Sequence, residues 1–267
     1  MHVELYEKTE PLGSVIHFLT VILESLGWNE EGDTLAMDVG CGAGNVTTKW
    51  ILPVFPNIKK MIALDHLPGM IQQARANHSH PKVEFHVANF EDSSSVEQWK
   101  GQISKLVSIH VFNWFKDQKK CFQTVYDLLQ PGGEAALYFV LHSDFYAGVV
   151  DVTKDPKWSP YFKGVDSWVP ESHFKRYDSS HYKKIAKDIG FSIVFCENEM
   201  KVNKLPSEKY AKDLYYSISA LAPYVPTNLK EEYKEDLYQH VLRNGGINAD
   251  GTQVHRASTL EIVLRKE

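Results

Sequence analysis

The sequence predicts an α/β fold built on a seven-stranded, mostly parallel sheet with helices on both faces. Two features of the chain predict it. Short apolar segments alternate with segments whose apolar residues recur at helical spacing, and a glycine-rich turn follows the first apolar segment. Strands that alternate with helices form βαβ units, which place helices on both faces of a parallel sheet. We expect the later segments to add a helical lid.

The expected strands are short apolar segments. They are residues 34–39, 60–65, 83–88, 104–111, 134–141, 191–196 and 258–265. The first leads into a glycine turn, and the second ends in an acidic residue. The last alternates apolar and polar residues, which is typical of a strand at the end of such a fold.

The expected helices lie between these strands and in the last third of the chain. They are residues 14–27, 45–55, 68–77, 117–129, 181–189 and most of 207–243. Gly27 suits the end of the first helix, and Pro68 suits the first turn of the third. Pro131, followed by two glycines, is expected to end the fourth helix. Pro223 and Pro226 are expected to interrupt the last helical stretch.

The pattern indicates a single domain over residues 1–267. A ligand-binding core is expected over about residues 30–141. Lid segments that enclose a substrate are expected over about residues 1–29, 142–178 and 205–245. The stretch 244–251 has the composition of a linker, and we interpret it as a loop.

The composition limits the class of protein. Of the 267 residues, 43% are hydrophobic and 24% are charged, which is typical of globular proteins and excludes a disordered, collagen-like or coiled-coil chain. Lys and Arg total 29 against 34 Asp and Glu, so the net charge is −5. Because an acidic surface is a poor match for a phosphate backbone, we expect no nucleic-acid partner.

The cysteines and the chain start bear on the compartment. Cys41, Cys121 and Cys196 are widely spaced and include no CxxC pair, which indicates reduced thiols and no zinc site. The first residues lack a basic and apolar leader, and no apolar run approaches the roughly 20 residues of a membrane span. We expect a cytoplasmic protein without membrane insertion or bound metal, as a monomer or a homodimer.

The sharpest motif is the glycine loop Asp38-Val39-Gly40-Cys41-Gly42-Ala43-Gly44. It ends the first expected strand and opens a helix. Glycines there permit positive φ angles and let a ligand touch the backbone. Asp65 ends the second expected strand, and its carboxylate can accept hydrogen bonds from both ribose hydroxyls of a nucleoside. In open α/β sheets the ligand binds at the carboxyl ends of the strands, where the strand order reverses.

The loop spacing distinguishes between cofactors. It is D-x-G-x-G-x-G rather than GxGxxG, and no basic residue is present in it to hold a phosphate. Asp38 would repel a pyrophosphate but not a sulfonium with an amino-acid tail. The loop therefore favours S-adenosylmethionine over NAD. The alternative is a plain strand-turn-helix bend without a ligand.

Two further strand ends carry candidate site residues. Asn89 and Phe90 follow the third expected strand, where an amide could bond the adenine edge and a ring could stack on it. The alternative is an ordinary loop asparagine beside a core phenylalanine. Ser108 and His110 end the fourth expected strand, beside the reacting methyl group. The alternative for His110 is a core histidine satisfied by hydrogen bonds.

Asp38 to Gly44 together with Asp65 resemble the class I S-adenosylmethionine-dependent methyltransferases, which have a Rossmann-like fold. A narrower resemblance lies outside this core. The segments that are similar to insect juvenile hormone acid O-methyltransferases are Leu5-Tyr6-Glu7-Lys8, residues 113–118 (NWFKDQ), Lys157-Trp158 and residues 216–223 (YSISALAP).

The resemblance implies an activity and a site. The family methylates the carboxylate of sesquiterpenoid acids such as farnesoic acid and juvenile hormone acid. The implied cofactor-binding residues are Asp38, Gly40, Cys41, Gly42, Gly44, Asp65, His66, Asn89, Phe90 and Ser108. The indole N–H of Trp114 is implied to hold the substrate carboxylate. The alternative for Trp114 is a buried indole bonded to a backbone carbonyl.

The chain departs from the family at one position. Where the family usually carries a glutamine that shares the carboxylate contact, this sequence has Gly13, followed by Ser14. His110 or Asn113 could supply the missing donor as a further catalytic group. The departure affects the identity of the acid more than the type of reaction.

Clustered aromatic residues predict an apolar substrate pocket. The expected lining residues are Tyr6, Trp114, Phe139, Phe145, Trp158, Tyr216 and Ile218. The alternative for each ring is a place in the core.

The chemistry expected from these residues is simple. A carboxylic acid is ionised at neutral pH, so methyl transfer to it by in-line displacement needs no general base. The alternatives are a fatty acid or another small carboxylate as acceptor, or a catalytically weak homologue that binds cofactor or lipid. A nucleic-acid methyltransferase is disfavoured, because Ser108-Ile109-His110-Val111 replaces the Asn/Asp-Pro-Pro-aromatic motif of amino-group methyltransferases.

Overall fold

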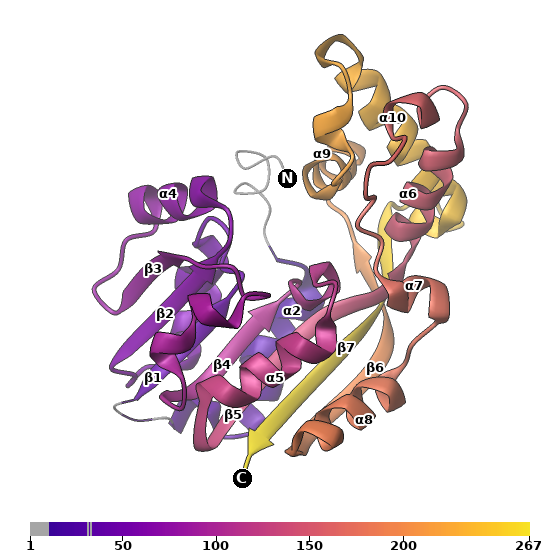
Figure 1. Ribbon diagram of the computed structural model, residues 1–267. Coiled ribbons are helices and arrows are strands. Elements are labelled where there is room, and N and C mark those ends of the chain that lie inside the picture. The colour runs from indigo at the N-terminus through magenta and orange to yellow at the C-terminus, as the bar shows by residue number, and fades with distance from the viewer. Residues whose placement is uncertain (1–10, 31, 33) are drawn as a thin grey trace. The chain divides into compact units, whose positions relative to one another are not determined.

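The computed structural model describes residues 11–30, 32 and 34–267 (Figure 1). Tyr6, the expected pocket residue nearest the start of the chain, and the segment Leu5-Tyr6-Glu7-Lys8 lie outside the described residues.

The described residues form a seven-stranded sheet of order β3-β2-β1-β4-β5-β7-β6. The strands are β1 (Leu35–Val39), β2 (Lys60–Asp65), β3 (Val83–Val87), β4 (Ile103–Ile109), β5 (Leu129–Ser143), β6 (Phe191–Lys204) and β7 (Val254–Lys266). The first five pair in parallel, with Asp38 beside Ala63 of β2 and Val107 of β4. The strand order reverses between β1 and β4, so the carboxyl ends of these two strands mark the switch point.

The chain folds into two compact units. The sheet unit comprises the described part of residues 10–139 with 177–198 and 260–267. The helical unit comprises 140–176 and the described residues 199–259. Strands β5 and β6 lead from the sheet unit into the helical unit, and β7 leads back. In the sheet β7 lies between β5 and β6, and because the chain runs along it in the opposite sense, back into the sheet unit, β7 is antiparallel to both. The predicted mostly parallel sheet is confirmed.

Helices cover both faces of the sheet unit, as predicted. One face is covered by the helical stretch α2 (Gly13–His17), Phe18–Ile22 and α3 (Leu23–Ser25), and by the turns Thr47–Ile51 and Leu52–Val54. The other side carries α5 (Gln118–Leu128) and α8 (Ser179–Ile189), in front of the sheet in Figure 1. The short helix α4 (Pro68–Asn77) joins β2 to β3.

Two adjacent residues of β5 show how each face is packed. Because side chains alternate along a strand, Tyr138 and Phe139 point to opposite faces. The Tyr138 ring packs on Phe18 with centroids 5.6 Å apart, and the Phe139 ring packs on Tyr182 of α8 at 5.1 Å. Both residues are fully buried, so the sheet unit has a core on each side.

The helical unit is built from segments on both sides of β6. Its helices are α6 (Asp144–Lys154), α7 (Glu171–Lys175), α9 (Glu208–Ile218) and α10 (Lys230–Val241). Single helical turns lie at Ser159–Tyr161, Ala222–Tyr224, Thr227–Leu229 and Leu242–Gly246. The predicted interruption of the last helical stretch at Pro223 and Pro226 is confirmed.

Three strands are longer than the sequence pattern predicts. β6 and β7 extend well past the apolar segments 191–196 and 258–265. β5 continues through Pro131, where the register against β4 shifts, so the expected break is a bulge. Gly132 takes a φ of +77°, and a Cβ on Gly133 would lie 2.8 Å from the carbonyl oxygen of Ile103. Glycine is therefore required for the bulge to stay in the sheet.

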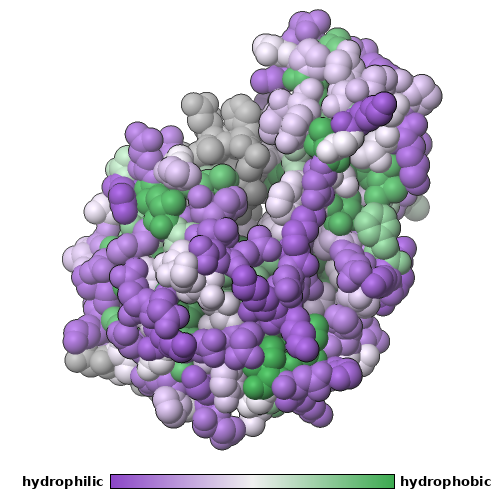
Figure 2. Space-filling view, viewed as in Figure 1, coloured by the Kyte–Doolittle hydropathy of each residue, from purple (hydrophilic) through white to green (hydrophobic). Residues whose placement is uncertain are grey.

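Among the described residues, no helix combines the length and the apolar character that crossing a membrane requires. The face drawn in Figure 2 is mainly hydrophilic, with apolar side chains in small separate groups.

Candidate active site

The glycine loop folds over the end of strand β2. The backbone N–H groups of Gly40 and Cys41 both donate to the carbonyl of Leu64, at 2.7 and 2.8 Å. The N–H of Gly42 donates to Oδ2 of Asp65 at 3.0 Å. The loop between β1 and the following helix is thereby fixed to the next strand of the sheet.

Two glycines of the loop are required by space as well as by backbone angle. Gly40 and Gly44 have φ angles of +80° and +87°. A Cβ on Gly40 would lie 2.1 Å from Cγ2 of Val111, and one on Gly44 would lie 3.0 Å from Ala74 and from Phe85. A side chain at Gly40 would push the loop away from Val111 after β4, and one at Gly44 would push it away from α4 and β3. The pattern read from the sequence therefore has a steric cause.

Asp65 holds its carboxylate in one orientation. Its Oδ2 accepts from Gly42, and its Oδ1 accepts from the N–H of Leu67 at 2.9 Å. The side chain is 11% exposed, and the exposed ring of His66 lies 3.7 Å from Oδ1. A carboxylate has about four acceptor sites, so two remain for donors from a ligand. That arrangement suits a vicinal diol.

Asp38 is buried without a cation. It is 2% exposed, and its Oδ2 accepts a 2.6 Å hydrogen bond from the hydroxyl of Thr47. Burial raises the pKa of Asp38 to about 7, the nearby charge of Asp65 adds to the rise, and the Thr47 hydrogen bond opposes it. A cationic ligand would favour the ionised form. The sequence reading missed Thr47, although the first turn after a glycine loop is where such a partner could be sought.

Cys41 lies in the same loop but is not set up as a nucleophile. The thiol is 6% exposed, and burial together with the charges of Asp38 and Asp65 raises its pKa. A thiol that stays protonated is a poor nucleophile, so its role in the loop is packing.

The loop after β3 is joined to the turn after β4. Asn89 is exposed, and its Oδ1 accepts from the N–H of Glu91 at 3.1 Å. Phe90 is buried and stacks on Phe115, with ring centroids 5.8 Å apart and planes 17° apart. The Glu91 carboxylate accepts from the N–H of Lys116 at 2.8 Å. The two candidate adenine residues are therefore held to the segment that follows Trp114.

The end of β4 carries the remaining residues of the site. The Ser108 hydroxyl donates to the carbonyl of Val39 at 3.0 Å, which ties β4 to β1 beside the glycine loop. His110 adopts a φ of +59°, which costs a non-glycine residue roughly 1–2 kcal/mol. Asn113 is buried and Trp114 is half-buried in the single turn Phe112–Trp114.

The structure thus gathers one set of predicted residues. The cofactor candidates, with His110, Asn113 and Trp114, all belong to the sheet unit, at or just after the carboxyl ends of β1, β2, β3 and β4. Phe139 also belongs to this unit, where it packs in the core between Phe112 and Tyr182.

The other expected pocket residues belong to the helical unit. Phe145 stacks on Tyr215, with centroids 5.6 Å apart and planes 17° apart. Tyr216 is 7% exposed, and Ile218, the last residue of α9, is half-buried. Their role toward a substrate stays a prediction.

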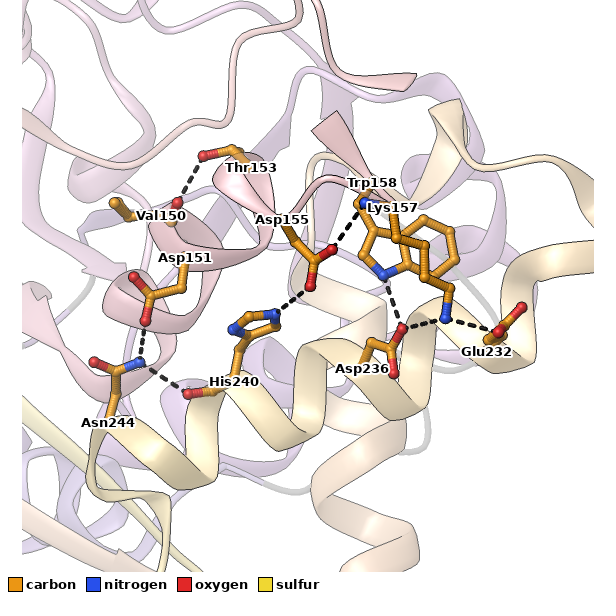
Figure 3. A network of polar contacts seen from close by, with 10 residues as sticks. All are labelled: Val150, Asp151, Thr153, Asp155, Lys157, Trp158, Glu232, Asp236, His240 and Asn244. Atoms are coloured by element: carbon orange, nitrogen blue, oxygen red, sulfur yellow. Dashed lines mark hydrogen bonds and ion pairs between the residues drawn. The ribbon is translucent and has the colours of Figure 1, made fainter. Parts of the chain in front are cut away.

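Trp158 takes part in a polar network of the helical unit (Figure 3). It is fully buried, and its Nε1–H donates to Oδ2 of Asp236 on α10 at 2.9 Å. The same oxygen accepts from the ammonium of Lys157, which also pairs with Glu232 at 2.7 Å. The network joins the segment after α6 to α10, so Trp158 has a packing role whether or not it meets a substrate.

Comparison with known proteins agrees with this geometry. A family model described as a methyltransferase domain matches residues 30–215. The chain is 24% identical over 255 residues to juvenile hormone acid O-methyltransferase of Bombyx mori, covering 90% of this chain and 85% of that protein. It is 22% identical over 220 residues to the protein of the same name from Drosophila melanogaster, covering 82% and 74%.

The fold is found in solved structures as well. The YcgJ protein from Bacillus subtilis superposes with a TM-score of 0.58 at 15% identity, covering 94% of this chain and 98% of that one. With its parallel order β3-β2-β1-β4-β5 and its antiparallel β7, the chain belongs to the methyltransferase domain family and has the Rossmann-like fold of the class I methyltransferases.

Proposed function

We propose that this methyltransferase uses S-adenosylmethionine to methylate the carboxylate of a lipophilic acid, most specifically a sesquiterpenoid such as farnesoic acid or juvenile hormone acid. The observation that carries the proposal is the similarity to two juvenile hormone acid O-methyltransferases over most of the chain. The resemblance of residues 113–118 and 216–223 to that family supports the same acceptor.

The residues of the sheet unit fit the cofactor chemically. The fixed Asp65 carboxylate would accept the ribose hydroxyls, and Asn89 and Phe90 would meet the adenine. His66 and Ser108 would border the nucleoside. The glycine loop would let the ligand lie close to the backbone of residues 40–44, beside the buried acid Asp38. No lysine or arginine pairs with either acid in the described structure, which suits a cation and not a pyrophosphate.

The reaction requires the protein to orient the acceptor carboxylate, and it requires no proton transfer. When bound, S-adenosylmethionine supplies an electrophilic methyl group on a sulfonium. Trp114 would donate its indole N–H to one oxygen of the acceptor carboxylate, and His110 or Asn113 would provide a second donor. These contacts would hold the other carboxylate oxygen in line with the methyl carbon and the sulfonium sulfur. Orientation of this kind can supply about 7–11 kcal/mol of a barrier in favourable cases.

The apolar part of the acid would meet aromatic side chains. The proposed lining residues are Tyr6, Trp114, Phe139, Phe145, Trp158, Tyr216 and Ile218. We also propose that residues 1–29, 142–178 and 205–245 act as the lid that excludes water from one methyltransferase domain, the core of which is about residues 30–141. Hydrogen exchange tests this proposal. When farnesoic acid and S-adenosylhomocysteine are added together, the backbone amides of residues 142–178 and 205–245 should become protected.

A methyl-transfer assay tests the proposed acceptor. The protein is incubated with S-adenosylmethionine and farnesoic acid, juvenile hormone acid, several fatty acids or a polar polycarboxylate, and methyl esters are measured by mass spectrometry. We expect esters of the terpenoid acids. If only fatty acids are esterified, the proposed reaction stands and the proposed substrate is wrong. Cofactor binding without any ester would overturn the acceptor class.

A further inference from the structure

His110 has a backbone conformation that its neighbours hold in place. It lies directly after β4 with a φ of +59°, and its N–H donates to the carbonyl of Tyr138 on β5 at 2.7 Å. Left-handed backbone at a bulky residue persists only where the surroundings over-determine it, and it is concentrated at functional sites. The conformation therefore identifies the end of β4 as a place where a side-chain direction is fixed.

Tyr138 contacts the imidazole of His110 as well as its backbone. The two rings meet edge to face, with centroids 5.1 Å apart and planes 85° apart. Tyr138 is fully buried, and its ring also packs on Phe18. Edge-to-face contact constrains the plane of a ring more than a loose apolar contact does. The half-buried imidazole is consequently constrained on the side that meets the Tyr138 ring.

The Tyr138 ring is in turn held at its hydroxyl. That hydroxyl donates to Oγ of Ser14 at 2.8 Å. Ser14 lies in the first turn of α2, and 124 residues separate it from Tyr138 in the chain. A phenol bonded at its end cannot shift along the ring axis without losing that bond, so α2, β5 and the end of β4 form one connected assembly.

We propose that Tyr138 and Ser14 are positioning residues that fix the imidazole of His110 as a hydrogen-bond donor to the acceptor carboxylate, beside Trp114. This rests on the proposed function. Neither residue touches the acceptor: Tyr138 acts through His110, and Ser14 acts through Tyr138. Their contribution is to keep the carboxylate oxygen in line with the methyl group, and a misplaced donor can cost as much as about 100-fold in rate.

Tyr138→Phe and Ser14→Ala test the proposal, because each removes one hydroxyl and leaves the ring contact with His110. Tyr182→Phe is the matched control. It removes the hydroxyl of a buried tyrosine in the same unit, where that hydroxyl donates to Gln118 Oε1 at 2.9 Å on the opposite face of the sheet. His110→Asn removes the imidazole and keeps a residue that tolerates left-handed backbone.

We expect Tyr138→Phe and Ser14→Ala to lower kcat for the acid about 10-fold, with the affinity for S-adenosylmethionine unchanged. Tyr182→Phe should leave kcat unchanged. The fall in kcat for His110→Asn should be at least as large as for Tyr138→Phe. The double variant His110→Asn/Tyr138→Phe should show no larger fall than His110→Asn alone. Equal kcat values for Tyr138→Phe and Tyr182→Phe, or full turnover by His110→Asn, would overturn the proposal.

A readout that does not depend on turnover separates this proposal from the proposed function. The imidazole signals of His110, assigned by NMR with His110→Asn, should change in Tyr138→Phe and not in Tyr182→Phe. On addition of farnesoic acid with S-adenosylhomocysteine they should shift in the wild type, and less in Tyr138→Phe. If the wild type esterifies no acid, the proposed function fails, whereas ring signals that are the same in the wild type and Tyr138→Phe overturn the positioning role.

Discussion

A carboxylate cluster of the helical unit and the buried acid Asp38 of the sheet unit have different partners. In the helical cluster the acids are paired with cations: Asp236 and Glu232 face Lys157, and Asp155 lies 3.3 Å from His240. The backbone N–H of Lys157 donates to the Asp155 carboxylate and is the main reason that the pKa of Asp155 is lowered. His240 lowers that pKa further. In the sheet unit, Asp38 is buried with only a hydroxyl as partner, and its pKa is raised to about 7.

This difference separates carboxylates that stabilise the fold from a carboxylate that is available to bind a ligand. Paired carboxylates that join two helices gain from the fold itself and have little left to offer a ligand. A buried acid without a cation costs the fold free energy, because burial disfavours its charge. Asp38 carries that cost at the carboxyl end of β1, at the switch point of the sheet. Such an arrangement is explained if a cationic ligand binds there.

The largest effect is expected from Asp65→Ala. Two charge-assisted hydrogen bonds of roughly 1.5–3 kcal/mol each would be lost, so the affinity for S-adenosylmethionine should fall more than about 100-fold. Isothermal calorimetry measures it. Asp236→Ala is the matched change in the helical unit, and it should lower the melting temperature without changing this affinity. Unchanged affinity in Asp65→Ala would remove Asp65 from the cofactor site.

Trp114→Phe should have the next largest effect. It keeps an aromatic ring and removes the N–H, so turnover on the acid should fall about 10-fold to 100-fold while cofactor affinity is preserved. Its counterpart, Trp158→Phe, loses the bond to Asp236 and should lower the free energy of unfolding by about 2 kcal/mol, again with cofactor affinity preserved. Steady-state kinetics and urea unfolding measure the pair. Normal turnover by Trp114→Phe would contradict its donor role.

The pH dependence of cofactor binding sharpens the contrast further. The native pKa of Asp38 lies above its ordinary value of 3.8, so the folded protein holds this proton up to about pH 7. Its contribution to stability consequently declines as pH rises from about 4 to about 7 and is constant above that range. The ionised form attracts a cation, so affinity for S-adenosylmethionine should rise about 10-fold between pH 6 and pH 8.

The control for that profile is Asp38→Asn, which cannot ionise. Its affinity should vary less over the same range, and the difference between the two profiles isolates Asp38 from the titration of the ligand. Parallel profiles in the two proteins would show that Asp38 does not sense the cofactor charge.

The smallest effect is expected from Gly13→Gln. Among the described residues, no atom lies within 4 Å of a Cβ built on Gly13, so these residues leave room for a Cβ at the start of α2. If this position corresponds to the glutamine of the resembling family, activity on farnesoic acid should rise a few-fold, measured as ester formed per minute. No change in activity, in a variant as stable as the wild type, would show that the alignment at Gly13 is wrong or irrelevant.

The sequence was a good guide where the signal is local. The segment 60–65 is the strand Lys60–Asp65, and Pro68 begins α4 as expected. Both depend on residues within a few positions of each other. The glycines of residues 40–44 were readable for the same reason, because positive φ is a property of single residues.

The sequence was a poorer guide where a distant partner decides. The expected strand 191–196 gave no sign of the extension of β6 to Lys204, because its polar half is a strand only through pairing within the sheet. Trp158 was expected to line a pocket. No residue near it in the chain indicates that its hydrogen-bond partner is Asp236, which is 78 residues away.

The sequence by itself therefore determined the alternation of strands and helices, the glycine loop and the acid at the end of each of the first two strands. Apolar spacing, backbone freedom and charge are carried by neighbouring residues. Only the tertiary structure decided that Asp38 bonds Thr47, that His110 takes a left-handed backbone against Tyr138, and that Tyr138 bonds Ser14. Those contacts depend on which side chains the sheet order brings together, and the residues concerned carry no local sign of it.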